Sequence, residues 1–288
     1  MYGGVDMVTF SKMHGLGNDY ICINTINDEN ILAENRLPQV VRYICNRNFG
    51  IGADGVILIQ TSKIADVKMR IFNKDGTEAE MCGNGIRCFS KYVYDNKIID
   101  KYIFTVETKA GIKTVKILRN NNIQEIEVDM GMINFNDYKN IKINRNYNGP
   151  VSINLKIKDQ KFIGNYVSVG NPHLVIFVNN VDNININEYG PIIENMNCFP
   201  NKINVEFVQI LGRNTIKLRV WERGVGETFA CGTGAVAAFG ISYYKWICGN
   251  KAKVLLKGGE LNVRYDKSSN HIIMSGIATK VFDGKINI

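Results

Sequence analysis

The sequence lacks any segment suited to crossing a membrane or directing export. Apolar runs such as residues 56–59 and 174–178 have the length of a strand, whereas a membrane helix needs about 20 apolar residues. Residues 1–14 contain neither the hydrophobic core of a signal peptide nor an Arg-rich amphipathic pattern. We therefore expect a cytoplasmic protein without a membrane partner, in which residues 1–6 are an extension before the first strand.

Cysteine pairs of the metal-binding kind are also missing. The seven cysteines are an odd number, and none of them forms a Cys-x-x-Cys pair. This pattern argues against a disulfide framework and against a zinc site. Reduced thiols agree with a cytoplasmic location, and no metal is expected.

Clustered positive charge is absent as well. The net charge is +8 and the pI is near 9.0, but no block of five Lys or Arg residues occurs. The lysines are scattered among many Ile and Asn residues, which indicates a broad compositional bias. We therefore expect no nucleic-acid partner. The sequence leaves the oligomeric state open, with a homodimer among the alternatives.

Two Cys-Gly-x-Gly turns stand out from this ordinary globular composition. They begin at Cys82 and Cys231, which lie 149 residues apart, and the same offset relates Arg70 to Arg219. A similar offset of 153 relates residues 17–18 to residues 170–171. Two long repeats of this kind predict two similar domains, since solenoids need at least three short units.

Strand patterns dominate both halves, and few helices are expected. The apolar run after Cys82 has one apolar stripe, whereas residues 235–244 after Cys231 are apolar on nearly every face and should be buried. The sequence thus predicts an α+β fold with two pseudosymmetric domains, each a mostly antiparallel sheet wrapped around a central helix. We place the first domain at residues 1–129 with 276–288, and the second at 130–275. Residues 279–288 could belong to either half.

A cysteine at the start of a helix is suited to acid–base chemistry. The N-terminus of a helix carries partial positive charge, which favours a thiolate and binds other anions. One thiolate could remove a proton from one face of a carbon while one thiol delivers a proton to the other face. Such a pair inverts a stereocentre without a cofactor. The paired motifs therefore indicate a racemase or an epimerase.

Simpler interpretations apply to the remaining polar residues. The other five cysteines are expected to be buried small hydrophobic residues. His173 could tune a thiol or could be a structural histidine at a strand end, and the sequence does not decide. Glu222 and Arg223 could form an exposed ion pair or a clamp for a substrate, and their alignment with Asn73 favours the clamp.

Several motifs together resemble the diaminopimelate epimerase family over nearly the whole chain from residue 7. The resemblance rests on the segments HGLGNDY at 14–20, NKDG at 73–76, CGNGIR at 82–87, GNPH at 170–173, ERGVGE at 222–227 and ACGTG at 230–234. It implies interconversion of LL- and meso-2,6-diaminopimelate without a cofactor or a metal, and two pseudosymmetric α+β domains with the last strand in the first domain.

The resemblance also implies a role for each matching residue. Cys82 and Cys231 would be the base and the acid, tuned by His173 and Glu222. The reacting carboxylate would bind the backbone amides of Gly83, Asn84, Gly232 and Thr233. Glu222 and the backbone of Arg223 would bind the reacting ammonium group. The distal end of the substrate would bind Asn18, Asn73, Asn171, Asn204 and the Arg223 side chain.

One position departs from the family pattern. Many members carry Gln where this chain has Gly55, so that contact with the substrate is lost or replaced by water. The nearest rival is a proline racemase or hydroxyproline epimerase, which usually has His at the position of Asn84. A non-catalytic binding protein would not need both thiols. A thiol–disulfide oxidoreductase would need a second cysteine close to each thiol in the sequence.

Overall fold

Strands dominate the computed structural model, which describes residues 7–27, 33–120, 123–142 and 149–288. The chain divides into unit 1, residues 1–128 with 276–288, and unit 2, residues 129–275. The first border follows Val128, one residue before the position expected from the sequence. The expectation about residues 1–6 lies outside the described residues. Within the described part of the chain, no helix is both long and apolar enough to span a membrane.

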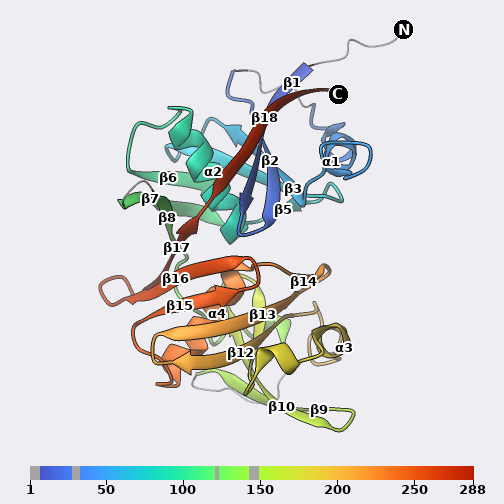
Figure 1. Cartoon of the computed structure of the whole chain (residues 1–288), viewed down its shortest axis with the longest axis vertical. Coiled ribbons are helices and arrows are strands. Elements are labelled where there is room, and N and C mark those ends of the chain that lie inside the picture. Colours follow the sequence, from blue (N-terminus) through green and yellow to red (C-terminus); the bar gives the residue numbers. More distant parts are fainter. Residues whose placement is uncertain (1–6, 28–32, 121–122, 143–148) are drawn as a thin grey trace. The chain divides into compact units, whose positions relative to one another are not determined.

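Unit 1 is a mostly antiparallel sheet with helix α2 packed on it (Figure 1). Its elements are β1 (Met7–Gly15), β2 (Asn18–Asn24), α1 (Leu37–Cys45), β3 (Gly55–Gln60), β4 (Val67–Asn73), β5 (Glu78–Ala79), α2 (Gly83–Asp95), β6 (Ile103–Thr108), β7 (Gly111–Asn120), β8 (Ile123–Asp129) and β18 (Thr279–Asn287). Its sheet contains the succession β18–β1–β2–β3–β4–β6–β7–β8, and β5 pairs with β4. Only β2–β3 and β4–β6 are parallel among these pairs.

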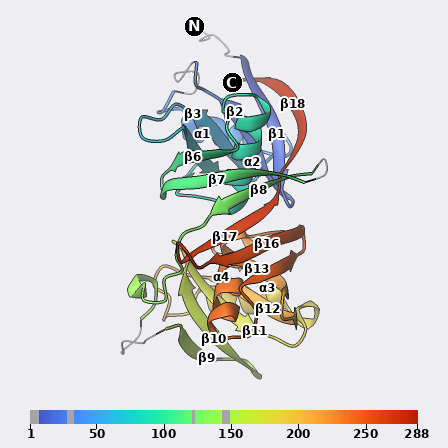
Figure 2. The same cartoon turned by 90° about the vertical axis from the view of Figure 1, so that its left-hand side faces the viewer.

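Unit 2 repeats this arrangement around helix α4 (Figure 2). Its elements are η1 (Tyr138–Asn140), β9 (Val151–Ile157), β10 (Gln160–Ser168), β11 (Pro172–Phe177), η2 (Val181–Asn183), α3 (Ile186–Glu194), β12 (Asn204–Gly212), β13 (Thr215–Glu222), β14 (Gly226–Thr228), α4 (Gly232–Tyr244), β15 (Lys251–Leu256), β16 (Gly259–Asp266) and β17 (His271–Ile277). The succession is β9–β10–β11–β12–β13–β15–β16–β17, with β14 on β13. The parallel pairs, β11–β12 and β13–β15, correspond to those of unit 1.

The two central helices differ as their sequences predict. Helix α2 buries its apolar stripe, including Ile86, Phe89 and Val93, but exposes residues toward its end. Helix α4 is buried from Gly232 to Ser242 except at Thr233. It contacts strands β10 to β13 as well as β15 and β16, so strands surround it. A helix that is apolar on every face is stable in water only when it is covered in this way.

Strand β18 settles the position of the last residues. It pairs antiparallel with β1 from Met7 opposite Asn287 to His14 opposite Thr279. Ile286 and Ile288 also pack against the core cluster that contains Val8 and Phe10. Of the two alternatives left by the sequence, residues 279–288 therefore return to unit 1.

Candidate active site

Each of the two helices begins directly after its cysteine, as predicted. Cys82 is the N-cap of α2 in an extended conformation, and its Sγ accepts a hydrogen bond from the Gly85 amide at 3.5 Å. Cys231 is the N-cap of α4 in the same conformation, and its Sγ accepts from the Gly234 amide at 3.3 Å. The two thiols therefore occupy equivalent positions, one in each unit. Both lie where helix amides lack partners within the helix and attract anions.

The last glycine of each motif is needed for close packing. A Cβ at Gly85 would lie 2.6 Å from Ile71 Cδ1, and one at Gly234 would lie 3.0 Å from Glu206 Oε1. Both distances are shorter than ordinary contacts between carbon and its neighbours. A larger residue would push the sheet side chain away or shift the start of the helix.

Polar groups from three segments meet around Cys82 in unit 1. The Tyr20 hydroxyl lies 3.0 Å from Cys82 Sγ and donates to Asn18 Oδ1 at 2.7 Å. Asn84 Nδ2 donates to the same Asn18 oxygen at 3.3 Å. Asn18 Nδ2 donates to Asp54 Oδ2 at 2.9 Å, which fixes the orientation of this amide. The structure thus brings together Asn18, Asn84 and Cys82 of the predicted residues.

Cys231 has a different environment in unit 2. Its Sγ lies 3.4 Å from Thr233 Oγ1, and the Glu222 carboxyl lies beside it. Burial, followed by the charge of Glu222, raises the pKa of the Cys231 thiol well above its ordinary value. Burial also raises the pKa of Glu222, against a 2.5 Å hydrogen bond from Thr228 Oγ1. The Gly234 amide at the helix start lowers the pKa of Cys231, in the direction expected from the sequence, but burial outweighs it.

His173 stands in a buried chain of hydrogen bonds. Its Nδ1 lies 2.7 Å from Glu206 Oε1, and its Nε2 lies 2.9 Å from Asn171 Oδ1. Asn171 Nδ2 reaches Thr233 Oγ1 at 3.5 Å, so the chain ends beside Cys231. His173 and Glu206 have fully buried side chains, and burial raises the pKa of Glu206. The structure connects His173 to the thiol region of its own unit.

Glu206 is a residue that the sequence analysis missed. Its Oε2 is buried without a hydrogen-bond partner, an uncommon and costly state for a carboxyl oxygen. A signal was present, because Glu206 is a single acid between Val205 and Phe207 in an apolar strand. A charged residue at such a position must be buried or must point away from the core. The sequence alone does not show which of these applies.

The remaining predicted residues organise loops. Asn204 Nδ2 donates to the Pro172 carbonyl at 2.8 Å, and its Oδ1 accepts from the Arg223 amide at 3.0 Å. Arg223 is exposed, and its Nη1 donates to the Asn201 carbonyl at 2.9 Å. The Arg223 guanidinium and the Glu222 carboxyl thus bind different partners and not each other. Asn73 ends β4, where its Nδ2 donates to Thr77 at 3.0 Å.

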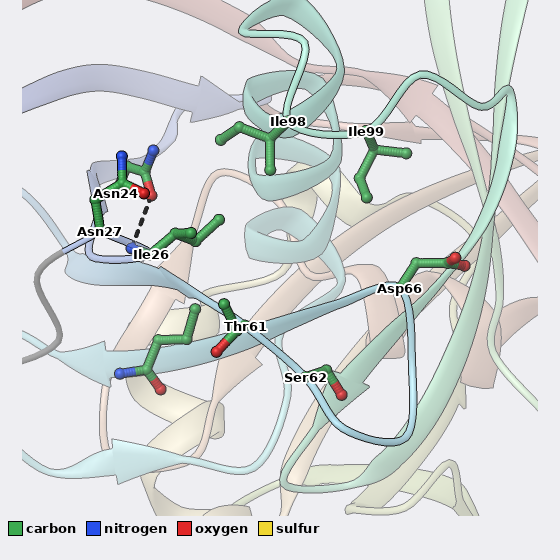
Figure 3. A pocket seen from close by; sticks show the side chains of 9 residues that line it. Asn24, Ile26, Asn27, Thr61, Ser62, Asp66, Ile98 and Ile99 are labelled. Atoms are coloured by element: carbon green, nitrogen blue, oxygen red, sulfur yellow. Dashed lines mark hydrogen bonds between the residues drawn. The ribbon is translucent and has the colours of Figure 1, made fainter.

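A separate cavity in unit 1 contains none of these groups. Its volume is about 430 Å³, and Asn24, Thr61, Ser62 and Asp66 are among its lining residues (Figure 3). The Asp66 carboxylate is already paired with Lys101 Nζ at 2.7 Å and hydrogen bonded to Thr105. No cysteine or histidine lines this cavity, so it does not offer the acid–base groups of the two helix starts.

Solved structures with similar folds support the α+β architecture. A phenazine biosynthesis protein of the PhzF family from Bacillus anthracis is 19% identical, with a TM-score of 0.69 over 98% of this chain and 99% of that chain. A hydroxyproline epimerase from Agrobacterium vitis is 11% identical, with a TM-score of 0.71 over 98% of this chain and 93% of that chain. At such identities these matches show the fold only, and the predicted fold class is confirmed.

Sequence comparison identifies the family. The profile described as diaminopimelate epimerase matches residues 10–136 and 165–281. A diaminopimelate epimerase from Methanococcus maripaludis is 45% identical over 280 residues, which are 97% of this chain and 99% of the relative. One from Acetivibrio thermocellus is 44% identical over 97% of this chain and 98% of the relative. With two helix-capping thiols at equivalent positions and this identity over nearly its full length, the chain belongs to the diaminopimelate epimerase family.

Proposed function

We propose that this protein is a cofactor-independent epimerase that interconverts LL- and meso-2,6-diaminopimelate. The observation that carries the proposal is the pair of thiols, Cys82 and Cys231, at equivalent N-cap positions of α2 and α4. Membership of the diaminopimelate epimerase family supports the choice of substrate. The meso product would serve the synthesis of lysine and of peptidoglycan precursors.

In this mechanism a proton leaves one face of the α-carbon and another proton arrives at the opposite face. The Cys82 thiolate takes the α-proton, and the Cys231 thiol delivers its own proton to the carbanion. The roles reverse for the opposite substrate. The raised pKa of Cys231 supports its assignment as the acid in the resting enzyme. No redox change occurs, so the reaction needs no oxidant, and the two protons balance.

The reacting carboxylate would bind at the helix starts. The amides of Gly83 and Asn84 open α2, and those of Gly232 and Thr233 open α4. Negative charge moves onto this carboxylate as the carbanion forms, and preorganised amides stabilise such charge without rearranging. The energetic gain is larger in the transition state than in the ground state, which is the requirement for catalysis.

The ammonium group and the distal end would use the other predicted residues. Glu222, beside Cys231, would bind the reacting ammonium group together with the Arg223 backbone carbonyl. The exposed Arg223 guanidinium can pair with the distal carboxylate in the bidentate manner of arginine. Asn18, Asn73, Asn171 and Asn204 would complete the distal site. His173 and Glu222 would tune the thiols.

The proposal also covers the location of the protein, its need for a metal and its partners. All seven cysteines are free, which supports a cytoplasmic location. Among the described residues no group of three or more His, Cys, Asp or Glu side chains could hold a metal ion. The proposal, like the family resemblance, involves no metal, so we expect full activity after treatment with a chelator such as EDTA; it also includes no nucleic-acid partner.

Incubation of the purified protein with LL-diaminopimelate in deuterated buffer tests the proposal. We expect meso-diaminopimelate that carries one deuterium at the inverted α-carbon, without any added cofactor. Proline in a parallel reaction should remain unlabelled, because it lacks the distal amino-acid group. Labelling and racemisation of proline at a comparable rate would replace this proposal with the proline racemase alternative.

A further inference from the structure

Tyr20 is a buried residue of unit 1 that has no role in the mechanism proposed above. It lies in β2 with 5% of its surface exposed. Its hydroxyl is 3.0 Å from Cys82 Sγ and 2.7 Å from Asn18 Oδ1. A buried hydroxyl this close to a thiol changes the relative stability of the thiol and the thiolate.

Gly55 makes room for this tyrosine. Tyr20 lies directly opposite Gly55 in the parallel pair β2–β3. A Cβ at position 55 would lie 3.2 Å from Tyr20 Cε1 and only 2.3 Å from the Phe72 carbonyl oxygen. The second distance involves backbone, which cannot move aside easily. Position 55 therefore has no room for a side chain, chiefly because of the Phe72 carbonyl, and Tyr20 packs directly against this glycine.

The internal repeat shows which residue corresponds to Tyr20 in unit 2. The offset of 153 that relates residues 17–18 to 170–171 places Tyr20 on His173. The pairing agrees, because His173 lies opposite Asn204 in β11–β12 as Tyr20 lies opposite Gly55 in β2–β3. Each unit thus carries a hydrogen-bonding ring side chain at the same position of its sheet.

We infer that Tyr20 is a positioning residue for Cys82 whose hydroxyl serves the sulfur in both of its protonation states. This inference rests on the proposed function, in which Cys82 alternates between thiolate and thiol. When Cys82 is a thiolate, the Tyr20 hydroxyl donates a hydrogen bond to Sγ and keeps its proton. Once Cys82 has taken the α-proton, its S–H group donates to Tyr20 Oη, and the hydroxyl turns to donate to Asn18 Oδ1.

Asn18 makes this exchange possible without leaving its own amide oxygen unpaired. Its Oδ1 also accepts from Asn84 Nδ2 at 3.3 Å, so one donor remains when the hydroxyl turns to the sulfur. Its Nδ2 stays on Asp54. No proton passes through Tyr20, and the hydroxyl only rotates.

Other groups near Cys82 remain constant in this exchange. The Arg87 guanidinium, which is fully buried, interacts electrostatically with Cys82 and donates to the Gly83 carbonyl at 2.9 Å. The Cys88 thiol lies six residues further along the chain, in α2, and Asp54 accepts a hydrogen bond from Asn18. Removal of the Tyr20 hydroxyl alone leaves the charges of Arg87 and Asp54 and the neutral Cys88 thiol in place.

Comparison of Tyr20→Phe with the unmodified protein tests the inference. Both proteins are treated with iodoacetamide between pH 6 and 10, and peptide mass spectrometry measures the alkylation rate of each cysteine. We expect Cys82 in the variant to react about three- to tenfold more slowly at neutral pH and its pH profile to move upward, in line with the loss of one hydrogen bond. Cys231 in the same chain should react at an unchanged rate. The turnover number kcat should fall by a similar factor with little change in KM.

Tyr166→Phe is the matched control, because Tyr166 is also buried and its hydroxyl donates to the Asp137 carbonyl at 2.8 Å in unit 2. Its loss should leave the reactivity of Cys82 unchanged. An unchanged Cys82 profile in folded Tyr20→Phe protein would overturn the inference, as would an equal change at Cys231. Absence of epimerase activity in the unmodified protein would instead refute the proposed function. The alkylation rates would then still show whether Tyr20 influences the Cys82 thiol.

Discussion

At the scale of single residues, the two helix-capping thiols have no substitute. A serine hydroxyl can replace the hydrogen bonds of Cys82 or Cys231 but is far too weakly acidic to ionise near neutral pH. We expect Cys82→Ser and Cys231→Ser each to lower kcat by a factor of about 10² to 10⁴, the usual contribution of an acid or a base. Deuterium incorporation into diaminopimelate measures the loss.

Cys88→Ser is the matched control for both variants. Cys88 is buried in α2 and burial raises its pKa to about 12, so it is an uncharged packing residue. Its substitution should lower the free energy of unfolding and leave kcat nearly unchanged. A loss of kcat in folded Cys88→Ser protein as large as that of Cys82→Ser would contradict the assignment.

Glu206 gives a prediction of pH dependence. Burial raises the pKa of Glu206 in the folded protein above its ordinary value of 4.5. Between pH 4.5 and this raised pKa, the folded protein therefore binds more protons than the unfolded chain. Stability from this group is complete below pH 4.5 and is lost as the pH rises toward the folded pKa. We expect the free energy of unfolding of the unmodified protein, relative to Glu206→Gln, to fall as pH rises from 4.5 to 7.5. Urea unfolding at several pH values measures the difference, and parallel curves would refute it.

The sequence predicted those site residues that have a local pattern and missed those whose contacts are formed only by the fold. Cys82 and Cys231 were predicted because the repeat and the local helix start are both visible along the chain. Tyr20 and Glu206 look like ordinary strand residues, and their importance comes from partners that are distant in sequence, Cys82 and His173. Such contacts depend on the register between strands, which a single sequence does not specify.

At the scale of elements, a charge network ties the turns that hold Asn18. Asp19 in β2 contacts Lys12 Nζ of β1 at 2.6 Å and Arg47 Nη2 of the loop after α1 at 2.7 Å. Arg47 also reaches Asp54, which accepts from Asn18. Burial opposes ionisation of Asp19, but the hydrogen bonds from Arg47 and Lys12 outweigh it and lower its pKa to about 2. The network therefore fixes the polar surroundings of Cys82.

Asp19→Asn should weaken this part of unit 1. A pKa depressed from 3.8 to about 2 contributes stability that is present above pH 3.8 and is lost as pH falls through about 2. We expect the variant to lose about 2 kcal/mol of unfolding free energy at pH 7 and to lack this acid dependence. Asp182→Asn removes an exposed ion pair with Lys217 and should cost less than about 0.5 kcal/mol. Equal losses in both variants would contradict the argument.

Helix α3 shows where sequence reasoning about elements fails. Residues 186–194 contain Gly190 followed by Pro191, a pair that ordinarily ends or interrupts a helix. The structure keeps them helical because the helix packs closely on the Trp221 indole. A Cβ at Gly190 would lie only 2.4 Å from this ring, so the contact requires glycine. Trp221 Nε1 also donates to Glu194 at the end of the helix, at 2.8 Å. The glycine that weakens the local pattern is the residue that permits this contact.

At the scale of the whole molecule, unit 1 is built from both ends of the sequence. Deletion of residues 279–288 would remove the partner of β1 along its length and uncover Val8 and Phe10. We expect unit 1 to become sensitive to trypsin while unit 2, which contains none of these residues, stays resistant. Mass spectrometry of the fragments distinguishes the two units. Unchanged protection of residues 7–128 would show that β18 is dispensable.

The sequence predicted the two-domain plan well because duplication leaves a periodic trace. It left the destination of residues 279–288 open, because the strand pattern of this segment fits either sheet equally. The choice is made by long-range pairing with Met7 to His14 and by the packing of Ile286 and Ile288 on the first core. Neither contact has a local signature.

The pairing of β1 with β18 also sets an order of events during translation. Its partners are separated by about 280 residues, which a ribosome adds in roughly 15 to 60 seconds at about 5–20 residues per second. All strands of unit 2 leave the ribosome before β18 does, so the domain synthesised second can finish folding first. Throughout this interval β1 presents one unpaired edge and part of an unfinished core. The nascent chain therefore has a window in which its first domain, which carries Cys82, exposes a strand edge of the kind that promotes aggregation.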